Sequence, residues 1–294
     1  MDKIAIVVQR YGKEVNGGAE LHARLLAEHL RSKYDVHVLT SCSLDYLLYW
    51  DNYYPEGEDE IDGIRILRFP NENKYQGRTR RLSRYFRGNQ KYFNINYKIS
   101  NFFILPIKRF KYRRRKKHNE LFELWIEGHG PVSPKMISYI EQEKNNYKAF
   151  IFFSYLFYPT YFGLQKVGEK SIFIPTAHDE PFFHFSGFEK IFSLPKFIMY
   201  NTESEQKLVE LTYPDTRRIN SDIAGVGFEP ALFDTSKECK IKGSYFIYIG
   251  RIDVNKGCKE LMDYFSNGNR PELKLVMIGK NHLKTPIANE SVIF

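Results

Sequence analysis

The stretch IAIVVQRYGKEVNGGAELHARLLAEHLRSKYDVHVLT, residues 4–40, decides the fold. It opens with a continuous apolar run of strand length over 4–8 and passes through a glycine-containing loop. Leucines at three-to-four spacing over 19–32 predict a helix, and 36–40 is a second buried strand. Two consecutive buried strands joined by a helix predict a parallel sheet with helices packed over it.

Later segments repeat this pattern and extend the sheet. The run Thr202-Glu203-Ser204-Glu205 is a capping-box sequence, which predicts a helix over 203–211 directly after a strand. We therefore expect an α/β fold with a doubly wound sheet. The additional buried strands are predicted at 64–69, 149–153, 171–174, 197–200 and 219–223.

A second strand–helix–strand unit begins after the regular pattern lapses near residue 225. Strands are predicted at 245–249 and 273–278, with a helix from Lys256 to Phe265 between them and a third strand at 291–294. Two complete strands and one helix cannot cover both faces of a parallel sheet, so we expect a piece of a longer protein. We predict a first domain over 1–225, a linker over 226–243 and the start of a second domain over 244–294.

Composition narrows the class of protein. The 294 residues are 43% hydrophobic and 27% charged, which excludes a disordered or collagen-like chain. Three cysteines without metal-site or redox spacing, and no signal peptide, predict a cytoplasmic protein. The longest uncharged stretch, 149–164, is shorter than the roughly 20 residues that cross a bilayer.

The net charge of +9 is concentrated in one segment. Between Lys74 and His118 lie sixteen Lys and Arg, ten aromatic residues and no Asp or Glu, whereas the rest of the chain has 28 basic and 35 acidic residues. Clustered cations with aromatics predict a patch, Lys74 to Lys117, that meets an anionic membrane surface, with Phe102 to Ile107 as the inserted wedge. A solvated insertion is the alternative. Nucleic acid is not expected, because no binding module surrounds the segment.

Two turns between a strand and a helix have sequences that suit phosphate. Gly17 and Gly18 precede the first helix, where backbone N–H groups and the helix dipole favour an anion. Neither the nucleoside-triphosphatase loop nor Gly-x-Gly-x-x-Gly is present, and a loop that only turns the chain is the alternative. Gly250, Arg251 and Lys256 follow the first strand of the second domain, where the two cations could neutralise a diphosphate.

Five motifs in order resemble the family-4 glycosyltransferases of the GT-B fold. The resemblance covers the first domain, without the basic segment, and the opening of the second. The motifs are Gly17-Gly18-Ala19-Glu20, Pro175-Thr176-Ala177-His178-Asp179, Asn201-Thr202-Glu203-Ser204-Glu205, Gly225-Val226-Gly227, and Gly250-Arg251 with Lys256-Gly257.

The resemblance implies two Rossmann-like domains facing a cleft, the second incomplete here, and sugar transfer from a nucleotide-sugar donor with retention of configuration. The second domain would hold the donor, and the first a saccharide or lipid-linked acceptor. Arg251 and Lys256 would stabilise the departing nucleotide diphosphate. His178 would contact the sugar or the reacting centre. The family's pair of acidic residues in the second domain does not occur before Phe294.

The ligand-contacting residues follow from the same motifs. Gly17 and Gly18 would approach the donor closely, Gly250 belongs to the diphosphate turn, and Asn201 ends a strand where it could touch ligand. Glu203 and Glu205 are expected to serve their helix. Glu20 is expected to serve the first turn of its helix, and a polar group facing the cleft is the alternative.

No cofactor or metal is expected. His178, Asp179, Glu180 and His184 lack a further ligand, and no Asp-x-Asp occurs. Two other functions stay open: a nucleotide-sugar epimerase of the same fold, which needs no acceptor, and a non-catalytic scaffold at a membrane surface.

Overall fold

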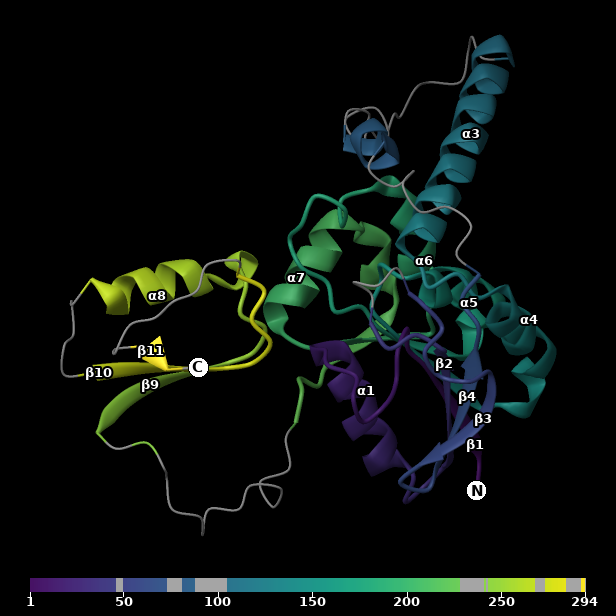
Figure 1. Cartoon of the computed structure of the whole chain (residues 1–294). Helices are drawn as coiled ribbons and strands as arrows, with labels where there is room; N and C mark the ends of the chain where they lie inside the picture. The colour runs from purple at the N-terminus through teal and green to yellow at the C-terminus, as the bar shows by residue number, and fades with distance from the viewer. Residues whose placement is uncertain are drawn as a thin grey trace. The chain divides into compact units, whose positions relative to one another are not determined.

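The computed structural model describes residues 1–45, 50–72, 81–87, 105–227, 241, 243–267, 273–283 and 292–293. It divides into two compact units, Met1–Phe228 and Glu229–Phe294, each with its own sheet (Figure 1). The predicted linker 226–243 lies mostly outside the described residues.

Unit 1 is built on an eight-stranded sheet in the order β3-β4-β2-β1-β5-β6-β7-β8, in which only β3 runs antiparallel to its neighbour. The strands are β1 Lys3–Val7, β2 Asp35–Ser41, β3 Gly57–Ile61, β4 Ile64–Phe69, β5 Ala149–Phe153, β6 Ser171–Ile174, β7 Phe197–Tyr200 and β8 Asn220–Ile223. The helices are α1 Gly18–Leu30, α3 Leu105–His129, α4 Pro134–Glu143, α5 Tyr158–Val167, α6 Glu189–Phe192 and α7 Glu203–Thr212.

Side chains alternate between the two faces of this sheet and fill two cores. One core contains Ile4, Ile6 and Val8 with residues of α1. The other contains Ala5 and Val7 with apolar residues of α3, α4, α5, α6 and α7. The buried apolar runs of the sequence therefore form a sheet covered on both faces, as parallel sheets require.

The basic segment is only partly described, and its described part contradicts a purely solvated insertion. A helical stretch over 81–87 places Phe86, 2% exposed, against Phe122 and Trp125 of α3. Trp125 also donates its indole N–H to Ser83 Oγ at 2.8 Å. Phe86 is thus a core residue, whereas the predicted wedge 102–107 falls largely outside the described residues.

Unit 2 has a parallel sheet in the order β11-β10-β9, formed by Ser244–Ile249 (β9), Leu273–Ile278 (β10) and Val292–Ile293 (β11). Helix α8, Cys258–Ser266, packs on this sheet through Cys258, Met262 and Phe265. The predicted α/β architecture is confirmed in both units. No helix in the described ranges is long and apolar enough to cross a membrane.

Candidate functional site

Four of the predicted site residues lie at one edge of the sheet of unit 1. His178 follows β6, Asn201 follows β7, and Gly17 and Gly18 follow the loop after β1. These strands are parallel and occupy the order β1-β5-β6-β7, so their carboxyl ends meet at the same edge. Open α/β sheets bind ligands at this edge. The imidazole of His178 is exposed there, and Asn201 is half-buried.

The loop after β1 is held in shape by a buried ion pair. Arg10 donates from Nε at 2.9 Å and from Nη2 at 2.5 Å to Glu20 Oε1, and both side chains are 6% exposed. Gln9 donates to the same oxygen at 2.9 Å. The guanidinium also donates to the carbonyls of Asn16 and Leu44, each at 3.1 Å. Glu20 is therefore a buried structural residue, which fixes the loop that precedes its helix.

The two neighbouring glycines of this loop have different surroundings. A Cβ placed on Gly17 would lie 2.0 Å from Glu20 Oε2, so Gly17 is required by the buried ion pair. A Cβ on Gly18, the first residue of α1, would meet nothing within 4 Å. The absence of a side chain at Gly18 leaves open space at the positive end of α1, where an anion is favoured.

The predicted start of α7 is confirmed, but the carboxylate of its capping motif has a wider role. Thr202 Oγ1 accepts the N–H of Glu205 at 3.0 Å, as a helix cap does. The carboxylate of Glu205 accepts the backbone N–H groups of Ala177 at 2.6 Å and Asn201 at 2.7 Å. Burial raises the pKa of Glu205, and the two amide donors oppose that shift. Glu205 thus joins the ends of β6 and β7, a contact that sequence reasoning missed.

The loop that carries His178 has further anchors. Tyr155, after β5, donates its hydroxyl to Glu180 Oε1 at 2.5 Å, and His184 Nε2 lies 2.7 Å from Asp179 Oδ1. Among the described residues, no three His, Cys, Asp or Glu side chains cluster as metal ligands would.

Unit 2 presents the predicted cationic turn after β9. Asp253 pairs with the guanidinium of Arg251, and its Oδ1 accepts the backbone N–H of Lys256 at 3.0 Å. Both cationic side chains are exposed. The helix predicted to start at about Lys256 begins two residues later, at Cys258, with Gly257 as its N-cap. Asp253 caps a short 3-10 turn over Val254–Lys256, and α8 begins only after Gly257.

A third cation, Lys280, follows β10 and was not predicted. The backbone N–H of Ile252 bonds to the carbonyl of Lys280 at 3.0 Å, so the turns after β9 and β10 lie side by side. A Cβ on Gly279 would lie 1.8 Å from Gly250 O, and this close approach requires glycine. The glycine after a predicted buried strand could have revealed this turn. The cavity described in unit 2, about 450 Å³, is lined by Phe246, Leu261, Tyr264, Phe265 and Leu273 and contains none of these cations.

The chain has the α/β fold of GT-B glycosyltransferases. A trehalose-6-phosphate protein from E. coli, solved with UDP-2-fluoro glucose, aligns at 11% identity and TM-score 0.53 over 95% of this chain and 65% of that one. The N-terminal domain of a Candida albicans trehalose-6-phosphate phosphatase aligns at 12% identity and TM-score 0.53 over 96% and 65%. A UDP-forming trehalose-phosphate synthase from Burkholderia vietnamiensis aligns at 10% identity and TM-score 0.50 over 95% and 64%.

These alignments span both units but define the fold alone. The chain covers about two thirds, 64 to 65%, of the length of these structures. No protein-family model matches the sequence, and no curated protein matches it. The resemblance to family 4 and the retention of configuration stay predictions.

Proposed function

We propose that this chain is part of a glycosyltransferase that moves a sugar from a nucleotide-sugar donor to a saccharide or lipid-linked acceptor. The observation that carries the proposal is the placement of the predicted residues at the carboxyl ends of parallel strands, in a fold shared with proteins such as the UDP-forming synthase. In this proposal unit 2 holds the donor.

Arg251 and Lys256 bind and stabilise the diphosphate as the glycosidic bond breaks. Charge develops on the leaving oxygen in that step, and positioned cations stabilise it more in the transition state than in the ground state. His178 orients hydroxyls at the reacting centre, while Asn201, Gly17, Gly18 and Gly250 contact or closely approach the ligand. No metal or cofactor enters the proposal, and the sugar is transferred with retention.

Isothermal titration of the complete gene product with UDP-, GDP-, ADP- and dTDP-sugars tests the donor assignment. We expect one nucleotide class to bind and Arg251→Ala to weaken it by about tenfold to a hundredfold, the loss of a charge-assisted hydrogen bond. Lys259→Ala, which removes an exposed cation of α8 paired with Asp263 at 3.2 Å, is the matched control and should bind normally. Absence of binding to every nucleotide sugar would overturn the proposal.

Product analysis tests the rest. Incubation with the bound donor and no acceptor should leave the sugar unconverted or slowly hydrolysed, whereas conversion to an epimer would establish the epimerase instead. With an acceptor, nuclear magnetic resonance of the product reports the anomeric configuration. A protein that binds donor and converts nothing under any condition would favour the scaffold.

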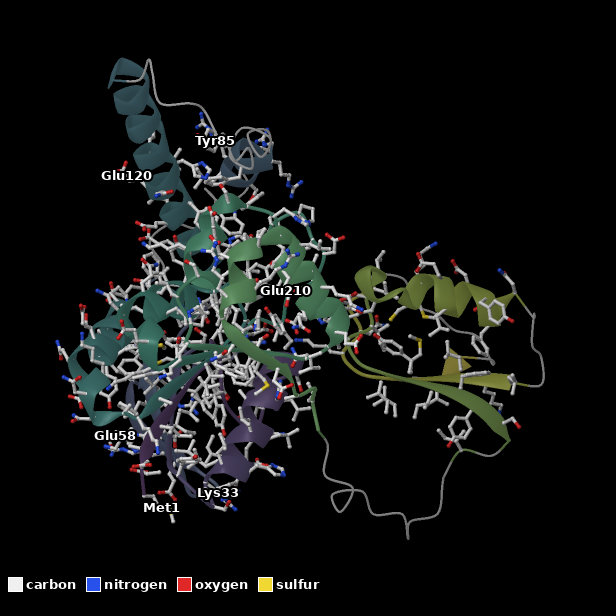
Figure 2. All side chains as sticks on the ribbon, turned by 180° about the vertical axis from the view of Figure 1, so that it is seen from behind. Met1, Lys33, Glu58, Tyr85, Glu120 and Glu210 are labelled. Carbon is white, nitrogen blue, oxygen red and sulfur yellow. The ribbon has the colours of Figure 1, made fainter. Side chains whose placement is uncertain are left out.

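We also propose that the protein works at the cytoplasmic face of a membrane, where a lipid-linked acceptor would lie. Arg81, Arg84 and Arg87 are exposed on the helical stretch over 81–87, at the spacing of one helix face. Figure 2 places the neighbouring Tyr85, together with Glu120 of α3, at the end of unit 1 opposite Met1 and Lys33. The exposed arginines support an anionic lipid surface as the partner.

A further inference from the structure

Glu205 makes two bonds that helix capping does not need. Capping of α7 is achieved by Thr202 Oγ1 and the N–H of Glu205, whereas the carboxylate reaches away from the helix to Ala177 and Asn201. Its two oxygens each accept one backbone N–H, at 2.6 and 2.7 Å, and the residue is only 6% exposed. A buried carboxylate with two short amide contacts fixes both amides in place.

The backbone that Glu205 holds is strained. Thr176, next to Ala177, has φ of 50°, and Ser154 at the end of β5 has φ of 63°. A β-branched residue rarely adopts this left-handed conformation, which persists only where neighbouring contacts impose it. The hydroxyl of Thr176 bonds to Ser154 Oγ at 2.9 Å, and Glu205 secures the following amide. Without Glu205 this turn would have fewer contacts opposing its relaxation.

His178 comes directly after the clamped amide of Ala177. On its other side, the carbonyl of His178 accepts the N–H of Glu180 at 2.8 Å, and Tyr155 holds the carboxylate of Glu180. The backbone of His178 is therefore fixed before and after the residue, while its imidazole stays exposed at the carboxyl edge of the sheet. These backbone contacts fix the direction of the His178 side chain, although none of them involves the imidazole itself.

We propose that Glu205 is a positioning residue for sugar transfer, which sets His178 against Asn201 by clamping the ends of β6 and β7. The proposal rests on the proposed function of His178 and Asn201. A carboxylate is required because two N–H donors face two acceptor oxygens. A glutamine has one oxygen and an NH₂ group, so Glu205→Gln turns one of the two contacts into a donor facing a donor.

Steady-state transfer kinetics of four proteins test the clamp: wild type, Glu205→Gln, His178→Ala and the double variant. Glu205→Gln should lower kcat by about tenfold to a hundredfold, because small misplacements of a reacting group have effects of this size, with donor KM changed less than about threefold. Thr202→Ala is the matched control, since it weakens the same helix turn and leaves the carboxylate contacts in place. It should lower the unfolding temperature and keep kcat.

The double variant distinguishes positioning from general damage. If Glu205 acts through His178, adding Glu205→Gln to His178→Ala causes no further loss of kcat, whereas additive losses overturn the proposal. Equal effects of Glu205→Gln and Thr202→Ala also overturn it. If the wild type transfers no sugar, the proposed function fails, and the clamp is judged by imidazole resonances. A shift of the His178 signals in Glu205→Gln and not in Thr202→Ala supports it, and unmoved signals overturn it.

Discussion

At the scale of single residues, the two neighbouring glycines of the loop after β1 differ in role. The fold requires a glycine at position 17, whereas at Gly18 only a closely approaching ligand would require one. Gly17→Ala should destabilise the protein by about 1–3 kcal/mol, because its Cβ would displace Glu20 from the buried ion pair. Gly18→Ala adds a methyl group in open space at a helical position, so stability should hold or rise by up to about 1 kcal/mol. Urea unfolding of both variants measures the difference.

Gly18→Ala is consequently a probe of the ligand. If the donor approaches this backbone closely, titration should show weaker binding in a variant that unfolds like the wild type. Undiminished affinity would mean that the ligand does not approach Gly18 closely. The glycine loop would then only turn the chain between β1 and α1.

His129 makes stability depend on pH. Burial against Trp125 lowers the pKa of His129 to about 4, below the usual value near 6.5. The unfolded chain therefore binds a proton between these values that the folded chain excludes, so stability is retained above pH 6.5 and falls as pH drops toward 4. The loss from this group should reach about 2–3 kcal/mol. His129→Phe should flatten that part of the profile in unfolding measurements at pH 7 and pH 4.5. An unchanged slope would contradict the assignment.

The part of the candidate site that lies directly after strands could be predicted from the sequence. His178, Asn201 and Arg251 were placed correctly at carboxyl ends, because a buried strand followed by a turn is visible in the local sequence. The contacts of Glu205 with Ala177 and of Arg10 with Leu44 were not predictable, since they join residues 28 and 34 positions apart. Such contacts depend on which strands are neighbours in the sheet.

At the scale of elements, the helical stretch over 81–87 divides its aromatics between core and solvent. Phe86 is 2% exposed and lies within 5.5 Å, between ring centroids, of Phe122, whereas Tyr85 is 36% exposed. Phe86→Ala should lower the free energy of unfolding by about 3–5 kcal/mol. Tyr85→Ala, the adjacent control, should have a much smaller effect. Similar losses for both would mean that the stretch does not pack on α3 as described.

The bounds of the strands with apolar sequences were predicted to within about one residue, whereas a strand with a mostly acidic sequence was missed. β10 has the predicted bounds, and β8 begins one residue later than predicted. The prediction that β8 is buried was wrong: three of its four residues are exposed, because it is the last strand at one edge of the sheet. β3 was missed because its five residues, Gly57–Ile61, are mostly acidic and exposed, with no apolar alternation. The following Asp62-Gly63, both at positive φ, is a hairpin turn signal that could have revealed it.

At the scale of the whole molecule, the uneven charge predicts how the protein meets membranes. The segment between Lys74 and His118 has sixteen cations, whereas the rest of the chain has more acidic than basic residues. An anionic surface should therefore attract this segment and repel the rest of the chain. We expect binding to vesicles of phosphatidylcholine with 30% phosphatidylglycerol, weak binding to phosphatidylcholine alone, and release as salt rises, because screening shortens the attraction.

Substitution of the exposed arginines on the helical stretch over 81–87 tests whether this part of the chain binds the membrane. Replacing Arg81, Arg84 and Arg87 by Ala together should weaken vesicle binding by about a hundredfold, at about 1 kcal/mol for each cation near the surface. The triple variant of Lys33, Lys144 and Lys196, all exposed and outside the basic segment, removes the same net charge. Cosedimentation of both proteins separates local from global electrostatics: equal losses would mean that only net charge matters, and the proposed membrane face would then be wrong.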